Sequence, residues 1–482
     1  MASLQSQALT GKLTGEKEIL FEAKNGQSSQ AFEGSFMVPE NRSKYRSKYR
    51  SKKDSRMIPI KYVRFPATGN KASSPIVYLS GGPGGSGIQT AKYWRFPLFM
   101  SMREFGDVIA LDQRGTGASD TNPKCESSVV IDHSQLMSDE DYIGLHQKAL
   151  KECLDFWKTK QVDVFGYTTE ESVKDLEDLR KHLQAEKISL WGISYGSHLA
   201  LSALKTMSDK LDRVMIASAE GLSQTVKQPA RTDAYFDRLQ LAINSQDKAR
   251  DMYGDIKKLI KRVHAKLEIK PLKLSIPADD GQSYDYILNR RDMQEFASAS
   301  ISGPAGAKRL LQLYLAIDNG MLEPVIAVVK RYYKPNAPIS YKVMSIAMDL
   351  ASGMSKQKRS DIETQAKSSL LKDYLNFSYH LTDVLPEIDL GDDFRKKSES
   401  SVPTLLLTGT LDGRTYIKSQ LESVSGLSNL TAVRVNNAGH NLFMFSAIET
   451  SPEVEKAMQE FMQGKEVSNK NITVSLPNFS KF

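Results

Sequence analysis

Residues 188–201 read ISLWGISYGSHLAL, and this stretch decides the fold. A short apolar run leads into the pentapeptide GISYG, and residues with a helical pattern follow it. A serine between a strand and a helix occupies a strained turn that exposes its hydroxyl at the edge of a sheet. Gly192 and Gly196 would keep the neighbouring backbone from colliding in that turn. The sequence therefore predicts Ser194 as an exposed nucleophile, and the alternative is a serine in an ordinary strand-to-helix turn.

Other short apolar runs surround this turn. They lie at residues 76–79, 108–112, 188–192, 214–218, 404–408 and 432–435. Such runs are typical of parallel strands that are buried on both faces. Between the second and third runs, Thr168 and Glu171 fit a capping box that begins an amphipathic helix. Strands that alternate with helices predict an α/β fold with a mostly parallel central sheet flanked by helices.

The strand pattern is interrupted between Leu222 and the run at 404–408. The intervening sequence is highly charged and helical in pattern, which indicates an inserted helical cap over the carboxyl edge of the sheet, where open α/β sheets bind their ligands. The chain has 482 residues, more than one ordinary domain. We expect the first part of the core at 1–224, the cap domain at 225–395, and the second part of the core at 396–482.

A nucleophilic serine needs a base, and the base needs an acid that fixes its tautomer. Asp412 follows the run at 404–408, and His440 follows the run at 432–435, so both are expected at the sheet edge that carries Ser194. The order serine, aspartate, histidine is one in which such triads occur. The remaining histidines lack this context, and we expect surface or packing roles for them: His133, His146, His182, His198, His264 and His380.

The loop SGGPGGSG at 80–87 follows the first buried run. A phosphate-binding loop of the Walker type is excluded because no lysine follows until Lys92. A dinucleotide fingerprint is disfavoured because no suitable acidic residue follows about 20 residues later. Beside a nucleophile, such a loop can supply backbone N–H donors to an oxyanion. We expect the donors of this oxyanion hole to be Gly82 and Tyr195, while Pro83 has no N–H and only stiffens the loop.

Glu220 follows the strand after the nucleophile turn and should lie near Ser194. The carboxylate has three interpretations. It could bind the free ammonium group of a substrate, act as a second-choice catalytic acid, or be a structural carboxylate satisfied by backbone amides. The structural carboxylate is the favoured interpretation of Glu220, and the binding of a substrate ammonium group is the second.

Composition excludes several classes of protein. Lys and Arg number 65 against 57 Asp and Glu, a mild excess that does not by itself indicate nucleic acid. No apolar stretch reaches the roughly 18 residues needed to cross a bilayer, so no membrane partner is expected. The segment RSKYRSKYRSKKDSR at 42–56 could be a basic binding patch, but a solvated hairpin insertion between two strands is favoured.

Two cysteines, Cys125 and Cys153, are too few for a disulfide scaffold and lack metal-site spacing. A single bridge and two free thiols remain equally open. The N-terminus has no basic head followed by an apolar core, which predicts a cytoplasmic protein, or an exported one if a signal peptide has been removed. The sequence gives no indication of the oligomeric state.

Taken in order, six motifs resemble one known family. GGPGGSG, DQRGTGASD, GYTTEESVKDLEDLR, WGISYGSHLAL, GTLDGRT and NAGHN are similar to those of the proline iminopeptidase and tripeptidyl aminopeptidase branch of the α/β-hydrolases. The resemblance covers about residues 75–225 and 400–445. It implies the α/β-hydrolase fold, serine-hydrolase chemistry without a metal or organic cofactor, and a cap that shapes the substrate pocket. The loop from Asp112 to Ser119 would then be structural support around the site.

Two departures from this family qualify the expected function. Ser80 stands where iminopeptidases usually have histidine, which puts narrow proline specificity in doubt, and no signal peptide of the exported relatives is seen. We expect an aminopeptidase that acts through an acyl-enzyme on a peptide. The alternatives are a carboxylesterase or lactone hydrolase on a small ester substrate, and a non-catalytic binding protein, since fold alone does not fix the substrate.

Overall fold

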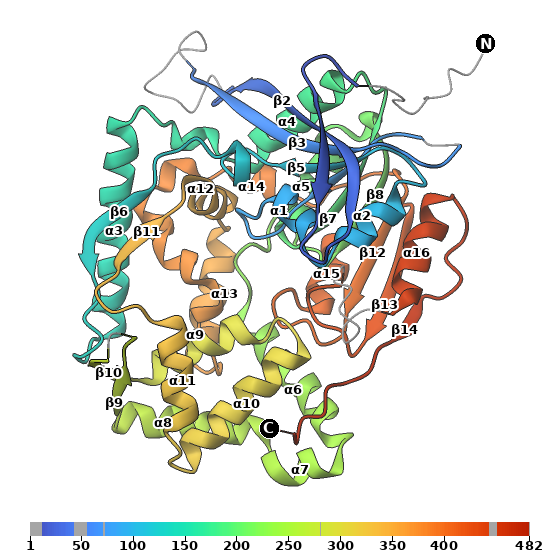
Figure 1. The fold of residues 1–482 in the computed structure, drawn as a ribbon. Coiled ribbons are helices and arrows are strands. Elements are labelled where there is room, and N and C mark those ends of the chain that lie inside the picture. Colours follow the sequence, from blue (N-terminus) through green and yellow to red (C-terminus); the bar gives the residue numbers. More distant parts are fainter. Residues whose placement is uncertain (1–11, 43–54, 71–72, 280, 443–450, 482) are drawn as a thin grey trace.

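The computed structural model describes residues 12–42, 55–70, 73–279, 281–442 and 451–481. A ten-stranded sheet forms the core, with the order β1-β2-β3-β5-β4-β7-β8-β12-β13-β14 (Figure 1). Its strands are β1 (Lys17–Glu22), β2 (Ser28–Pro39), β3 (Met57–Phe65), β4 (Ile76–Leu79), β5 (Val108–Asp112), β7 (Ile188–Ile193), β8 (Leu211–Ala217), β12 (Thr404–Gly409), β13 (Leu430–Asn436) and β14 (Asn471–Thr473).

The pairing of the strands changes once across the sheet. The pairs from β1 to β5 along the edge are antiparallel, and all pairs from β5 through β4 to β14 are parallel. Every residue of β4, β5, β7 and β12 is buried, as the continuous apolar runs predict. The carboxyl ends of β7, β12 and β13 therefore meet at one edge of the sheet.

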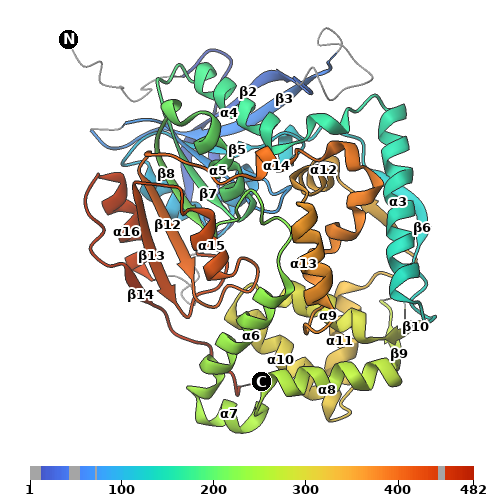
Figure 2. The same cartoon turned by 180° about the vertical axis from the view of Figure 1, so that it is seen from behind.

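Helices cover both faces of the sheet (Figures 1 and 2). On one face, α1 (Gly87–Lys92), α2 (Phe96–Met102) and α16 (Pro452–Met462) pack in a common apolar core with the strands. On the other face, α3 (Asp139–Thr159), α4 (Thr169–His182) and α5 (Tyr195–Thr206) do so. Thr168 caps α4 by accepting a hydrogen bond from the Glu171 backbone N–H. Two short helices, α14 (Asp392–Arg395) and α15 (Ile417–Ser423), complete this part.

The insertion between β8 and β12 is mostly helical, but it also contains strands. Its helices are α6 (Pro229–Asn244), α7 (Asp247–Tyr253), α8 (Ile256–Ile269), α9 (Arg290–Ser300), α10 (Pro304–Asp318), α11 (Glu323–Tyr332), α12 (Val343–Ser352) and α13 (Lys356–Ala366). The strands β9 (Leu272–Pro277) and β10 (Ser283–Leu288) form an antiparallel hairpin, and β11 (Pro338–Tyr341) pairs with β6 (Cys125–Val130). The insertion was expected to be helical, and these three strands were not anticipated. LKLSIP and SYDYIL alternate with a period of two around a glycine turn, which favours a hairpin.

The insertion does not form one separate core. Helices α6 to α11 pack around their own apolar cluster, in the lower part of Figure 1. Helix α12 instead contributes Val343, Ile346 and Leu350 to the cluster that includes α4 and α5. Phe479, beyond β14, is buried in the cluster of α6 to α11. The division at residues 224 and 395 remains a prediction from the sequence.

Two further features of the sequence can be placed. Cys125 of β6 and Cys153 of α3 form a disulfide bond, with their Cα atoms 5.5 Å apart, which resolves the alternative left open by the sequence. Most of the basic segment at 42–56 lies outside the described residues, so its interpretation stays a prediction. No helix in the described part of the chain is both long and apolar enough to cross a membrane.

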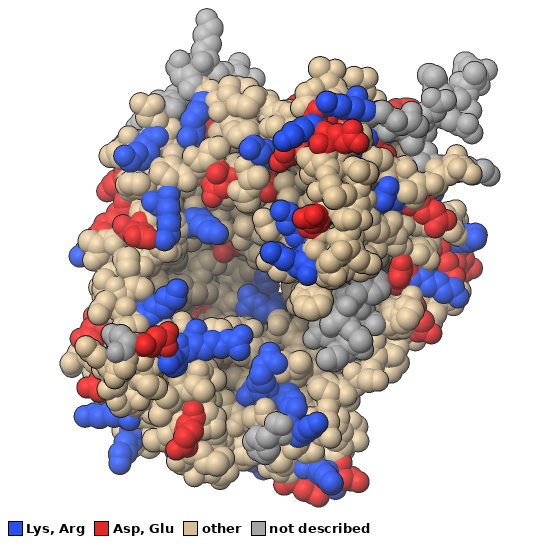
Figure 3. Space-filling view, viewed as in Figure 1, with Lys and Arg blue, Asp and Glu red and all other residues tan. Residues whose placement is uncertain are grey.

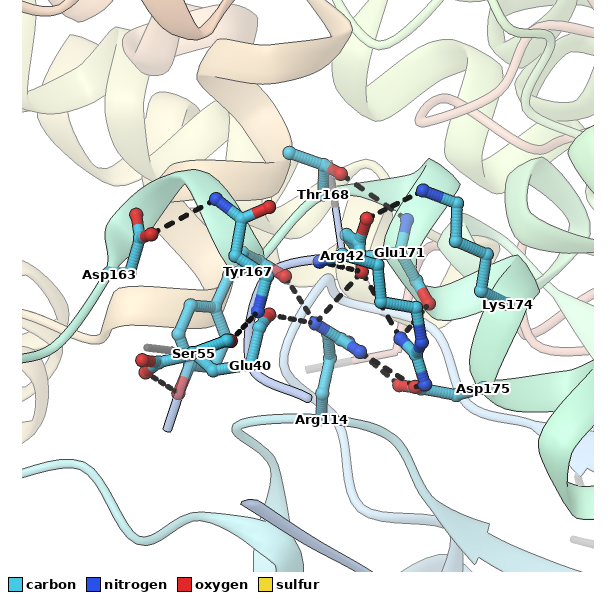
Figure 4. A network of polar contacts seen from close by, with 12 residues as sticks. Glu40, Arg42, Ser55, Arg114, Asp163, Tyr167, Thr168, Glu171, Lys174 and Asp175 are labelled. Carbon is cyan, nitrogen blue, oxygen red and sulfur yellow. Dashed lines mark hydrogen bonds and ion pairs between the residues drawn. The ribbon is translucent and has the colours of Figure 1, made fainter. Parts of the chain in front are cut away.

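The loop that follows β5 is anchored by Arg114, which is fully buried (Figure 4). Its guanidinium donates two hydrogen bonds to Asp175 of α4, at 2.7 and 2.6 Å. It also donates to the backbone carbonyls of Glu40 and Gly166. The side chain thereby joins the residue after β2, the loop after β5, the middle of α4 and the turn that precedes α4. These contacts are consistent with the supporting role expected for residues 112–119.

Candidate active site

Ser194 lies in the turn between β7 and α5, with φ 55° and ψ −125°. Its backbone N–H donates to the Ala217 carbonyl at 3.1 Å, which fixes the turn against β8. The two flanking glycines are required by close backbone approach. A Cβ atom on Gly192 would lie 2.5 Å from the Gly196 carbonyl oxygen, and one on Gly196 would lie 2.0 Å from that of Leu79. The left-handed φ and the absence of side chains at both glycines are those of a nucleophile turn.

Asp412 and His440 meet at the same edge of the sheet. The Nδ1 atom of His440 lies 2.9 Å from Asp412 Oδ2. Asp412 also accepts hydrogen bonds from the backbone N–H groups of Arg414 and Thr415, both at 2.8 Å, and from the Thr415 hydroxyl at 2.6 Å. Burial favours a raised pKa for Asp412. The charge of His440, its hydrogen bond and the hydrogen bonds from Thr415 outweigh burial, so the pKa of Asp412 is lowered. Asp412 is therefore an ionised, fixed acceptor for the imidazole.

The backbone of His440 is held by two further hydrogen bonds. Its N–H donates to the Ser302 carbonyl at 2.6 Å, and its carbonyl accepts from the Ser218 hydroxyl at 2.7 Å. With Nδ1 directed at Asp412, the other ring nitrogen is available to the cavity that His440 and Ser194 line together. Within the described residues no direct hydrogen bond joins Ser194 Oγ to His440. Catalytic hydrogen bonds often tighten only when substrate is bound.

The glycine-rich loop lies against Ser194. A Cβ atom on Gly81 would be 3.1 Å from Ser194 Cβ, a closer contact than most Cβ atoms make, so the loop backbone packs tightly on the serine. In the described part of the chain, neither the Gly82 nor the Tyr195 backbone N–H donates to a protein acceptor. Tyr195 is the first residue of α5, where a backbone N–H has no partner within the helix. Both predicted donors thus lack a protein acceptor among the described residues, and Gly82 lines the cavity.

The loop is held from two sides. Asp112 at the end of β5 accepts hydrogen bonds from the Ser86 hydroxyl at 2.5 Å and from the Ile88 backbone N–H at 3.0 Å. Ser345 of α12 donates to the Pro83 carbonyl at 3.1 Å. The core thus fixes one end of the loop and the insertion fixes its tip, so the donors are positioned before a substrate arrives.

The cavity beside Ser194 has a volume of about 670 Å³ and a charged lining. It lies between the sheet edge and the insertion, and Figure 3 shows this face of the molecule hollowed between the two, with Lys and Arg side chains around the hollow. The charged residues that line it are Arg95, Glu220, Lys227, Asp349 and Arg414. A cavity of this size and polarity suits a small charged molecule better than a purely apolar one.

Glu220 does lie in this cavity, but it already has a cationic partner. Lys227 Nζ lies 2.8 Å from Glu220 Oε2, and both side chains are mostly buried. Burial favours a raised pKa for Glu220, but the charge of Lys227, followed by that of His198, outweighs it, so the pKa is lowered. The favoured interpretation had named backbone amides as the partners of a structural carboxylate. Lys227 is the partner instead, and it follows Glu220 closely enough in the sequence to have been considered.

Asp349 of α12 is the carboxylate that sequence reasoning missed. It lines the cavity, and in the described part of the chain no Lys, Arg or His side chain lies within ion-pair distance of it. Burial, and then the negative charge of Glu220, raise the pKa of Asp349 to about 7. A carboxylate in this position is stabilised by any cation that enters. No local motif marks Asp349, because it comes from a helix of the insertion.

Two arginines in the same cavity also lack carboxylate partners within the described residues. Arg95 donates to the Tyr78 hydroxyl, while its Nε atom is buried without an acceptor. Arg414 donates from Nη1 to the Ser298 carbonyl at 3.1 Å. Burial lowers the pKa of the Arg414 guanidinium, although the charge of Glu220 opposes this. The cavity can therefore bind anionic as well as cationic groups.

The remaining histidines lie outside this arrangement. His198 and His264 are buried in helices, and burial lowers the pKa of each to about 4. Surface or packing roles were expected for these histidines, and the buried environments of these two are those of packing residues. Among the described residues, no group of His, Cys, Asp and Glu side chains has an arrangement that could hold a metal ion.

Comparison with known proteins supports the fold. Residues 74–300 match the model of a family described as the alpha/beta hydrolase fold. The serine protease Hip1 of Mycobacterium tuberculosis is 26% identical over 172 residues, which are 34% of this chain and 33% of that protein. A probable proline iminopeptidase of Leptolyngbya boryana is 26% identical over 159 residues, 32% of this chain and 36% of that protein. The matches thus span about a third of each relative's length.

One solved structure is a proline iminopeptidase-related protein from Thermus thermophilus. It has 16% identity and a TM-score of 0.37, covering 89% of this chain and 97% of that chain. The family match and the observed sheet confirm the expected fold. The chain has the α/β-hydrolase fold, with a mostly parallel central sheet flanked by helices.

Proposed function

We propose that this protein is a serine hydrolase that cleaves peptides from their free N-terminus. Ser194 is the nucleophile, His440 the general base and acid, and Asp412 the residue that orients His440. The observation that supports the chemistry is the Asp412–His440 hydrogen bond of 2.9 Å, with His440 and Ser194 lining one cavity. Relatives named serine protease and probable proline iminopeptidase agree with this proposal.

The reaction proceeds in two steps. Ser194 Oγ attacks the carbonyl carbon while His440 accepts the hydroxyl proton, and the N–H groups of Gly82 and Tyr195 stabilise the oxyanion. The C–N bond then breaks, and His440 returns the proton to the leaving nitrogen. Water, deprotonated by His440, attacks the acyl-enzyme, and Ser194 regains its proton as the acid product leaves.

The substrate's ammonium group would be bound by Asp349. Glu220 is neutralised by Lys227, whereas Asp349 has a raised pKa and lacks a cationic partner among the described residues. An ammonium ion at hydrogen-bond distance would restore the ionised form of Asp349. Glu220, the residue first considered for this role, would then contribute its charge at longer range. The charged lining also disfavours a neutral acyl group, because burying unpaired charges is costly.

The test compares rates on one preparation. The substrates are arylamides of proline, alanine and a tripeptide with free N-termini, their N-blocked versions, and short-chain p-nitrophenyl esters. We expect the free-amine arylamides to turn over, and we expect N-blocking to lower kcat/KM by at least about tenfold, since it removes a charge-assisted hydrogen bond. Ser194→Ala should lower kcat by roughly 10⁴-fold or more without a change in the unfolding midpoint.

Each other outcome has a definite meaning. Turnover of the esters alone would contradict the peptidase proposal and favour the carboxylesterase or lactone hydrolase alternative. Appreciable residual kcat in Ser194→Ala would contradict the assignment of the nucleophile. Failure of a fluorophosphonate probe to label the wild-type protein, together with the absence of turnover, would favour a non-catalytic binding protein.

A further inference from the structure

A second cavity meets the first at His440. It has a volume of about 700 Å³ and lies among α9, α10, α11 and the loop after β13. The two cavities share Ala299, Ser302, His440 and Asn441, while Ser194 lines the first one alone. Its walls include an apolar set from the three helices: Phe296, Leu310, Leu313, Val328 and Tyr332. The second cavity is therefore open to a group that extends from Ser194 past His440.

Two exposed arginines line the second cavity, Arg309 of α10 and Arg331 of α11. Neither forms an ion pair within the described part of the chain. The Arg331 guanidinium lies 5.5 Å from the centre of the Tyr332 ring. The neighbouring Lys330 of α11, in contrast, pairs with Asp279 at 2.9 Å and does not line the cavity. Within the described residues, the two arginines thus present positive charge to the cavity without an ion-pair partner.

One carboxyl group, Glu295, also lines this cavity. Burial, and then the charge of Asp292, raise the pKa of Glu295 to about 7. The Tyr142 hydroxyl lies 3.3 Å from Glu295 Oε2. Near neutral pH, Glu295 therefore carries only part of a negative charge, and the charge of the cavity remains positive.

The position of His440 decides which part of a substrate each cavity receives. The acyl group must lie with the oxyanion loop, Ser194 and Asp349, all in the first cavity. The leaving atom must lie within hydrogen-bond reach of His440, because His440 gives it a proton. The acyl group occupies the first cavity, so a leaving group that starts at His440 extends into the second cavity. The second cavity is the leaving-group side.

We propose that the second cavity binds a leaving group that carries a carboxylate, held by Arg309 and Arg331. For a peptidase this group is the released portion of a short peptide, whose C-terminal carboxylate reaches the two guanidinium groups while an apolar side chain packs between α9, α10 and α11. The peptide form of the inference rests on the function proposed above. It adds a restriction on length, because the C-terminus of a long chain lies far from both arginines.

The expected effect is moderate, because both arginines are exposed. Exposed ion pairs contribute little individually, and two such contacts together should favour a carboxylate over a neutral group by about tenfold. Salt should weaken the preference, since charges at an exposed site are screened. Both properties separate this site from the buried network around Asp412.

The test measures kcat/KM for pairs of substrates that differ only in the charge of the leaving group. One pair is a free-amine tetrapeptide with an apolar third residue and a C-terminal carboxylate, and the same peptide as its C-terminal amide. The other pair is 4-acetoxybenzoate and 4-acetoxybenzamide, acetyl esters whose leaving phenols carry a carboxylate or an amide. The proteins are wild type, Arg309→Gln, Arg331→Gln, the double variant, and Lys330→Gln as the control of equal charge loss.

We expect the acid-to-amide ratio to be about ten in wild type and in Lys330→Gln, and to fall below about two in the double variant. A ratio near one in wild type, or one that persists in the double variant, would overturn the inference. Acid preference in the ester pair without peptide turnover would retain the inference and refute the peptidase function. Peptide turnover without acid preference would do the opposite.

Binding extends the test to a protein without turnover. Calorimetry with Ser194→Ala should give a Kd for the peptide acid about tenfold below that for the amide, and the gap should close when Arg309→Gln and Arg331→Gln are added. Equal affinities for acid and amide, or no binding of either, would contradict the inference.

Discussion

Arg114 and Arg414 show two uses of an arginine near the candidate active site. Arg114 is fully buried and donates to both oxygens of Asp175 and to two backbone carbonyls. Arg414 lines the cavity beside Ser194, and within the described residues its guanidinium donates to one carbonyl, that of Ser298. A buried arginine whose hydrogen bonds are all made by the protein, such as Arg114, stabilises the fold. An arginine without a carboxylate partner, such as Arg414, lies where a charged substrate could bind to it.

The largest effect on activity is expected at Asp412. Its carboxylate has hydrogen-bond partners within the protein, as that of Asp175 does, and one of them is His440. Asp412→Asn should lower kcat by about 10⁴-fold, since an amide cannot hold the imidazole in the required tautomer. Thermal unfolding should show a smaller loss, about 1–3 kcal/mol, because one amide N–H₂ would face existing donors. Steady-state kinetics on the preferred arylamide gives the first number. A loss of activity below about tenfold would remove Asp412 from the proposed triad.

Arg114 should show the reverse pattern. Arg114→Met removes two hydrogen bonds to Asp175 and leaves Arg42, 2.8 Å away, as its cationic partner. The free energy of unfolding should fall by roughly 2–4 kcal/mol, because two buried carbonyls also lose their donor. Urea denaturation measures this. At temperatures where the variant remains folded, kcat should stay within a few-fold of wild type, because Arg114 does not line the cavity. Lost activity with unchanged stability would place Arg114 with the substrate-binding charges instead.

Replacing Asp349 should weaken substrate binding and, at neutral pH, should increase the free energy of unfolding. Asp349→Asn should lower kcat/KM for free-amine arylamides by roughly ten- to fiftyfold and should leave N-blocked substrates and esters little changed. The pKa of Asp349 is about 7 in the folded protein and about 4 in the unfolded chain. The folded state therefore binds the proton more tightly, and stability is lost as pH rises from about 4 to about 7.

The asparagine variant lacks this loss of stability. It should be more stable than wild type above pH 7, by on the order of 4 kcal/mol, with the difference vanishing below about pH 4. In wild type, KM for a free-amine substrate should fall as pH rises through about 7, because Asp349 ionises. Urea denaturation and KM measured from pH 4 to 8 check both statements. A pH-independent difference in stability would show that Asp349 does not titrate in this range.

The smallest effect is expected for an exposed pair. Lys124 and Glu126 form a close ion pair, with side chains 71% and 53% exposed. Lys124→Gln should change the free energy of unfolding by less than about 0.5 kcal/mol, because water competes for both groups. A change above 1 kcal/mol in urea denaturation would mean that closeness alone, without burial, gives a charge pair its structural value.

The parts of the structure that could be predicted are those that a short run of sequence determines. The strand before Ser194, the glycines of its turn, and the placement of Asp412 and His440 after buried runs each follow from short patterns, because strand burial and tight turns restrict residue types nearby. The hairpin of β9 and β10 was also readable from its alternation, and it was missed because the surrounding sequence is helical.

Other features depend on contacts distant in the chain. Asp349 acquires its raised pKa from burial beside Glu220, and α12 carries no motif that would place it there. The disulfide between Cys125 and Cys153 was one of two open possibilities until β6 and α3 were seen side by side. The second cavity arises where α9, α10 and α11 meet the loop of His440. Charge and packing at such places are set by tertiary structure, which short patterns do not encode.

The packing of Phe479 into the insertion has a consequence for the order of events during synthesis. The Phe479 N–H donates to Gln246 at 3.0 Å, its carbonyl accepts from the Tyr253 hydroxyl at 3.1 Å, and its ring completes the cluster of α6 to α11. In both ribbon views the last part of the chain runs back to these helices (Figures 1 and 2). A ribosome must therefore translate more than two hundred further codons after Tyr253 before this helical layer can close, and a nascent chain would expose its unfinished apolar surface to chaperones throughout that interval.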